Sequence, residues 1–134
     1  MNKFIKVGLV CIRNKALLLC RPYAFNDLIL PGGQRGSDES DTACLLREIK
    51  EELGSSAELE MDTLQYFGRF EDVAASYKEK RVEITIYLGQ ISGALKPSSE
   101  IKDLVWFSSS DDSTQLSPII RNHILPALQK AELL

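Results

Sequence analysis

One segment of the chain, residues 31–54, constrains the fold more than any other. It opens with Pro31-Gly32-Gly33, which favours a turn, and it closes with Gly54, which is typical of a helix end. Between them the sequence predicts a single helix over residues 41–53, entered through the small and acidic residues 37–41. Apolar residues repeat on one arc of this helix and are expected to face a core: Leu45, Leu46, Ile49 and Leu53.

Most of the remaining chain shows β-type patterns. Residues 4–12 and 16–21 are apolar runs around Arg13-Asn14-Lys15, which predicts a hairpin. Residues 82–91 alternate between apolar and polar side chains, as a half-buried strand does. Further elements are predicted as short strands over 28–30, 64–70 and 104–107, and as a last helix that begins at Ser117-Pro118 and is kinked at Pro126. We therefore expect one α+β domain over residues 1–134, an α/β/α sandwich with a mixed sheet between helices.

Length, charge and cysteine content argue against several classes of protein. The 134 residues suffice for one domain, and 16 Lys plus Arg against 19 Asp plus Glu give a net charge of −3. That balance disfavours binding to nucleic acid through its phosphate backbone. The longest apolar runs fall far short of the ~20 residues that cross a bilayer. The cysteines are odd in number and form no CxxC pair, so we expect no disulfide framework, no zinc site and a cytoplasmic location.

Three glutamates, Glu48, Glu51 and Glu52, are spaced so that they share one stripe of the predicted helix. Like charges at this spacing destabilise a helix by about 0.2–0.5 kcal/mol per pair. Glu51 and Glu52 also lie in the last turn, where the helix dipole disfavours anions. A solvated acidic face is one explanation of this cluster. The other is a set of hard oxygen ligands for a divalent cation, most naturally Mg²⁺.

The segment from Gly33 to Ser55 resembles the Nudix box. The pattern is Gly33, five residues, Glu39, seven residues, and then Arg47-Glu48-Ile49-Lys50-Glu51-Glu52-Leu53-Gly54. Its one departure is Ser55, where an apolar residue is usual. The resemblance implies the fold of a small, MutT-like Nudix hydrolase. It further implies cleavage of a nucleoside diphosphate linked to another moiety, through attack of water on a phosphorus atom.

The resemblance also assigns expected roles to individual residues. Glu48, Glu51, Glu52 and the backbone carbonyl of Gly32 would bind Mg²⁺, with Mn²⁺ as an alternative. Arg47 would hold Glu48 in position through a charge-assisted hydrogen bond. The structural positions of the box are Gly33, Glu39 and Gly54.

Three carboxylates are candidates for the general base that activates the attacking water. Glu48 is the first candidate because it belongs to the box. Glu100 is the second, since some Nudix relatives carry a catalytic or metal-binding glutamate in the loop before the corresponding strand. Glu83, on the polar face of its predicted strand, is the weakest of the three.

The sequence constrains the substrate less. Arg21 resembles an arginine near the nucleotide in MutT-like proteins, and Phe25 is one of several aromatic residues able to stack on a base. No proline lies between Pro31 and Pro97, which differs from the pattern of ADP-ribose hydrolases. Leu116, beside Ser117, stands where purine-sanitising relatives have an asparagine. We therefore expect a nucleoside triphosphate or a modified nucleotide as the partner of the chain, and neither nucleic acid nor membrane.

Several alternatives stay open. The domain can be a non-catalytic module that senses or binds a nucleotide, or a hydrolase of ADP-ribose, a nucleotide sugar or coenzyme A. The complete set of Arg47, Glu48, Glu51 and Glu52 favours an enzyme, because non-catalytic relatives often lose one of these residues. Dimers are common among similar proteins, so a homodimer is also open.

Overall fold

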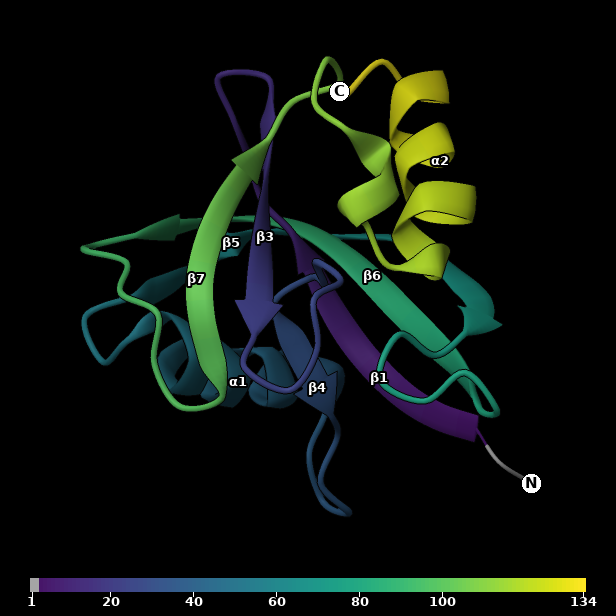
Figure 1. Ribbon diagram of the computed structural model, residues 1–134. Helices are drawn as coiled ribbons and strands as arrows, with labels where there is room; N and C mark the ends of the chain where they lie inside the picture. Colours follow the sequence, from purple (N-terminus) through teal and green to yellow (C-terminus); the bar gives the residue numbers. More distant parts are fainter. Residues whose placement is uncertain (1–2) are drawn as a thin grey trace.

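The computed structural model describes residues 3–134, in the order of strands and helices that Figure 1 shows. The strands are β1 (Lys3–Val10), β2 (Ile12–Arg13), β3 (Ala16–Pro22), β4 (Gly32–Gln34), β5 (Glu58–Val73), β6 (Arg81–Ser92) and β7 (Ile101–Phe107). The helical elements are α1 (Asp41–Leu53), the 3₁₀ turn η1 (Ser113–Gln115), the π-helical turn η2 (Ile120–Ile124) and α2 (Leu125–Lys130). Within this part of the chain, no helix is long and apolar enough to span a membrane.

The strands form two sheets. A four-stranded sheet has the order β4-β1-β6-β5, in which β1 and β6 are parallel and the other pairs antiparallel. A three-stranded antiparallel sheet has the order β2-β3-β7. Helices α1 and α2 lie on opposite sides of this β layer (Figure 1). The predicted mixed sheet between helices is confirmed. The predicted hairpin forms only at its tip: Ile12–Arg13 pairs with β3, whereas β1 pairs with β6 in the larger sheet and β3 pairs with β7 in the smaller one.

Alternation along the strands creates two cores, one under each helix. On β1, Val7 and Leu9 pack with the apolar residues of α1, whereas Val10 packs with those of the C-terminal helix. On β3, Leu18 packs toward α1 and Leu17 toward the other core. This period of two places neighbouring residues on opposite faces of a strand.

Helix α1 has the bounds that the sequence predicts. The side chain of Ser40 caps its start by accepting a hydrogen bond from the Ala43 N–H, and Gly54 ends it with a φ of +96°. The buried arc is wider than expected and covers about half of the helix circumference at about 100° per residue. It includes Glu48 and Glu52, while Leu46 lies beyond its edge with 36% of its surface exposed. The prediction that Leu46 faces the core is therefore wrong.

The segment before α1 also differs from expectation. Residues 28–30 form only isolated bridges, in which Ile29 pairs with Cys20 and Leu28 with Leu116. The strand is instead Gly32–Gln34, which pairs antiparallel with β1 at the edge of the larger sheet. A β-carbon at position 32 would lie 2.1 Å from the Val7 carbonyl oxygen, and Gly32 has a φ of +141°. Glycine therefore permits this strand, where the sequence predicted only a turn.

The C-terminal helix begins after Ser117 and contains a π-helical turn. The Ser117 carbonyl accepts hydrogen bonds from the N–H groups of Ile120 and Arg121, as expected at a helix start. Turn η2 directly precedes α2, whose second residue is Pro126. Proline lacks the N–H that would continue the ordinary helical pattern, so the predicted irregularity at Pro126 takes the form of this wider turn.

Candidate active site

Arg47 connects the loop before α1 to the carboxylates of the helix. Its Nε and Nη2 donate to both carboxylate oxygens of Glu39, at 2.7 and 2.8 Å, and its Nη1 donates to Glu48 Oε2 at 2.9 Å. Glu39 also accepts from the Gly36 N–H at 2.7 Å. The hydrogen bonds from Arg47 and Gly36 hold the pKa of Glu39 at about 2. Arg47 is thus a fixed cation that joins a loop carboxylate to a helix carboxylate.

Glu52 is an almost fully buried carboxylate, with 2% of its surface exposed. It accepts a hydrogen bond from the Gly32 N–H at 2.8 Å, which ties the end of α1 to the edge strand β4. Burial raises the pKa of Glu52 to about 8, and the charges of Glu48 and Glu100 raise it as well. A cation bound beside the Glu52 carboxylate would lower its pKa.

Glu48 lies one helical turn earlier and is also buried. Burial raises its pKa, although the charge and the hydrogen bond of Arg47 oppose that effect. Gly33 lies directly against the Glu48 side chain: a β-carbon at position 33 would lie 2.4 Å from Glu48 Oε2. The glycine of the box therefore makes room for the carboxylate rather than for a turn alone.

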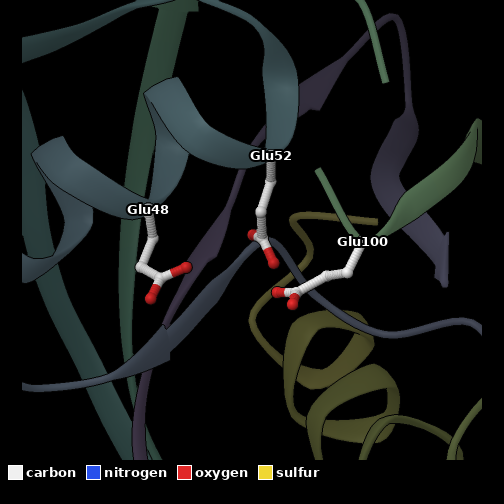
Figure 2. Close-up of side chains that lie close together, drawn as sticks. All are labelled: Glu48, Glu52 and Glu100. Carbon is white, nitrogen blue, oxygen red and sulfur yellow. The ribbon is translucent and has the colours of Figure 1, made fainter. Parts of the chain in front are cut away.

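Glu100 completes the cluster from the other side. One carboxylate oxygen each of Glu48, Glu52 and Glu100 lie within 4.8 Å of one another. Figure 2 shows the two helix side chains and the loop side chain converging on the same space. The Glu100 loop is fastened to the end of α1, because the Lys96 and Ser98 N–H groups donate to the carbonyls of Leu53 and Glu52.

The structure separates the predicted site residues into two groups. Glu48, Glu52 and Glu100 come together, with Arg47 and Gly33 against them. The Glu51 side chain is 50% exposed and contacts Arg47 at 3.3 Å, so it lies outside this cluster. Glu83 is paired with Lys3 at 3.1 Å.

The two predicted substrate-binding residues have different surroundings. Arg21 donates to the Asn26 carbonyl and, at 3.2 Å, to Gln115 Oε1, so its guanidinium joins two loops. Phe25 faces two adjoining hollows. The larger hollow, about 400 Å³, is lined by Gly32 and by the three clustered carboxylates.

The smaller hollow, about 50 Å³, adjoins the larger one, shares Gly32 and Gly33 with it and has mostly apolar walls. Lys6 and Ser76 line both hollows, and Ser117 lines the smaller one. Sequence reasoning did not assign a binding role to these three residues. The one available signal was the alternation of β1, which places Lys6 on the same face as Phe4 and Gly8.

A carboxylate cluster lies at a glycine-rich strand edge, next to a mostly apolar hollow. Comparison with protein families identifies the family. The model of the NUDIX domain matches residues 3–125, and the chain therefore belongs to the Nudix family. Membership in this family supports a hydrolase that acts on acid anhydrides in phosphorus-containing compounds.

Solved structures support the same fold. The E. coli ORF135 protein matches with a TM-score of 0.71 and 24% identity over 98% of this chain and 94% of its own. The MutT Nudix hydrolase from Burkholderia pseudomallei matches with a TM-score of 0.75 and 22% identity over 96% and 98%. A UDP-X diphosphatase matches with a TM-score of 0.70 and 21% identity over 98% and 64%. A comparison with curated proteins gave no significant match.

Proposed function

We propose that this protein is a metal-dependent pyrophosphohydrolase of a nucleoside diphosphate derivative, most simply a nucleoside triphosphate or a modified nucleotide. The observation that carries the proposal is the convergence of Glu48, Glu52 and Glu100 on one hollow. Structural neighbours of the same fold include a UDP-X diphosphatase and a MutT Nudix hydrolase. The name of the UDP-X diphosphatase concerns a diphosphate of a nucleotide, in agreement with this substrate class.

The donor set fits a hard divalent cation. Carboxylate oxygens are the ligands that Mg²⁺ and Mn²⁺ prefer, and the buried Glu48 and Glu52 have raised pKa values that a nearby cation would lower. Glu48, Glu52 and Glu100 would hold Mg²⁺, with Mn²⁺ as an alternative, and the predicted contributions of Glu51 and the Gly32 carbonyl belong to the same proposal. When bound, the cation would neutralise phosphate charge and acidify water.

The side chains themselves divide the remaining tasks. Glu48 and Glu100 face the hollow and can accept the proton of an attacking water, since an ionised carboxylate is a proton acceptor. Arg47 orients Glu48 by the hydrogen bond at 2.9 Å, so it is a positioning residue. Glu39 in turn fixes Arg47 from the loop side.

The cellular setting completes the proposal. The three cysteines, Cys11, Cys20 and Cys44, are buried and free, which is compatible with the predicted cytoplasmic location. A homodimer stays a prediction, as does the absence of nucleic-acid and membrane partners.

The test is a screen for release of phosphate or pyrophosphate with Mg²⁺. The substrates are nucleoside triphosphates, oxidised nucleotides, nucleotide sugars, ADP-ribose, dinucleoside polyphosphates and coenzyme A. On the best substrate, we expect Glu52→Gln to lower the rate at least ~100-fold, the typical cost of losing a charged ligand or a positioned base. Glu60→Gln, an exposed carboxylate on β5, serves as the matched control. Turnover of none of these compounds, or full activity of Glu52→Gln, would refute the proposal.

A further inference from the structure

The small hollow beside the carboxylate cluster has a single charged side chain. Its floor comes from β1 and β6, and its walls come from the start of the C-terminal helix and from the two loops that carry Phe25 and Ser76. Most of its lining is apolar, including Phe4, Leu30, Ile84 and Ile119. Lys6 is the exception. A flat aromatic ring suits such walls, and the few polar groups then decide which ring is accepted.

Lys6 has no carboxylate partner among the residues that the structure describes. Three lysines of the described residues do pair with carboxylates, Lys3, Lys50 and Lys78, whereas others such as Lys80 and Lys102 resemble Lys6 in having no such partner. Lys6 is half-buried as a residue, and its ammonium lies 5.8 Å from the centre of the Phe4 ring. Against the effect of burial, its charge also lowers the pKa of Glu52, so it lies where the two hollows meet. An ammonium beside a mostly apolar hollow favours a ligand that supplies a hydrogen-bond acceptor.

Ser117 contributes a second unpaired group to the same hollow. Only 2% of its surface is exposed, and its Oγ has no hydrogen-bond partner within residues 3–134. Buried hydroxyl groups are usually hydrogen-bonded, so an orphan at the wall of a hollow indicates a place for a ligand atom. The sequence and the strand pairing thus bring a donor-only side chain and a free hydroxyl to one small space.

The volume of the smaller hollow limits which part of a nucleotide can enter it. If the diphosphate lies at the carboxylates, the edge of the base farthest from the sugar points away from them. The smaller hollow holds about 50 Å³, the room of about four water molecules. That space accommodates the far edge of a base rather than a complete nucleoside. Uracil, thymine and guanine carry a carbonyl oxygen on this edge, whereas cytosine and adenine carry an amino group.

We propose that Lys6 makes the enzyme selective for nucleotides whose base carries a carbonyl oxygen on that far edge, and that Ser117 holds the edge in place. The Lys6 ammonium donates to this oxygen. The Ser117 hydroxyl accepts from the adjacent ring N–H of these bases, but it can also donate to the ring nitrogen of cytosine or adenine, so the selectivity comes from Lys6. The amino group of cytosine or adenine in the same place is itself a hydrogen-bond donor, so the Lys6 ammonium would have no acceptor there. The inference deepens the proposed function and rests on it for the position of the diphosphate.

The experiment compares matched pairs of nucleotides. We expect kcat/KM for UTP to exceed that for CTP, and for GTP to exceed that for ATP, by about 10-fold or more, the discrimination of one charged hydrogen bond. In Lys6→Met, which keeps the length of the side chain, both ratios should fall to near one. Ser117→Ala should raise KM for all four nucleotides and leave both ratios close to those of wild type, because its hydroxyl can serve either kind of ring nitrogen. Lys102→Met, an exposed lysine on β7, is the control and should leave both ratios unchanged.

Two results would overturn the inference. One is a wild-type enzyme that hydrolyses all four nucleotides with ratios near one. The other is a Lys6→Met variant that loses activity equally on all four, which would place Lys6 on the phosphates. Calorimetric binding of UMP against CMP, and of GMP against AMP, separates this inference from the proposed function. Selective monophosphate binding without turnover would refute the hydrolase and keep the specificity, and equal monophosphate binding would refute the specificity.

Discussion

Glu52 gives the sharpest link between stability and function in this domain. In the folded chain, burial raises its pKa from 4.5 to about 8. A carboxyl whose pKa is higher in the folded state stabilises the fold fully below its unfolded pKa, and that contribution is lost as pH rises through the folded value. Without metal, the wild-type protein should therefore lose stability between about pH 4.5 and about pH 8.

The size of this loss follows from the same values. Each pKa unit corresponds to about 1.4 kcal/mol, so at pH 7.5 the charged Glu52 costs on the order of 4 kcal/mol of unfolding free energy. Glu52→Gln keeps an acceptor for the Gly32 N–H but has no charge to bury. The metal-free variant should be more stable than wild type at pH 7.5, with a melting temperature higher by roughly 10–15 °C. Near pH 4.5 the two proteins should melt together.

The assay is thermal and urea unfolding from pH 4.5 to 9 in EDTA, followed by titration with Mg²⁺. A divalent cation that binds only the folded state should raise the melting temperature of wild type and change Glu52→Gln little. Glu60→Gln, on the exposed face of β5, controls for loss of a carboxylate as such. Parallel pH profiles of wild type and Glu52→Gln would refute the reasoning, as would equal stabilisation of both by Mg²⁺.

Two further predictions concern residues that hold the carboxylates in place. In Gly33→Ala, the new methyl group would lie 2.4 Å from Glu48 Oε2, so we expect the Glu48 side chain to be displaced. Titration with Mg²⁺ should then show at least ~10-fold weaker binding of the metal. An unchanged affinity for Mg²⁺ would contradict this reasoning. Arg47→Lys keeps the positive charge but loses the bidentate hydrogen bonds to Glu39. We expect kcat of this variant to fall about 10–100-fold. A kcat equal to that of wild type would show that the charge alone suffices.

The sequence was most informative where local chemistry decides the structure. The helix bounds at Asp41 and Leu53 follow from a serine cap and a terminal glycine, and the alternation of residues 82–91 predicts β6. Local sequence signals did not predict elements that depend on pairing with a residue distant in the sequence. Strand β4 exists because Gly33 pairs with Val7, and the bridge of Leu28 needs Leu116 from the far end of the chain.

The candidate site shows the same division. The spacing of the glutamates placed Glu48 and Glu52 on one side of α1, but their burial depends on the edge strand and on the Glu100 loop. Glu51 shares the helical stripe and the box with Glu48 and Glu52, but its side chain is half exposed, because an angle on a helix does not show where the neighbouring elements end. The small hollow with Lys6 and Ser117 is built by several elements, and no local pattern describes it.

The hydrogen bonds that fasten the Glu100 loop to the end of α1 have a consequence for folding. The Lys96 and Ser98 amides reach the Leu53 and Glu52 carbonyls only after β5 and β6, which lie between them in the chain, have closed a long loop. Glu100 can therefore join Glu48 and Glu52 only once these strands have formed. A divalent cation held by all three carboxylates should stabilise the docked loop and slow hydrogen exchange of the Lys96 and Ser98 amides.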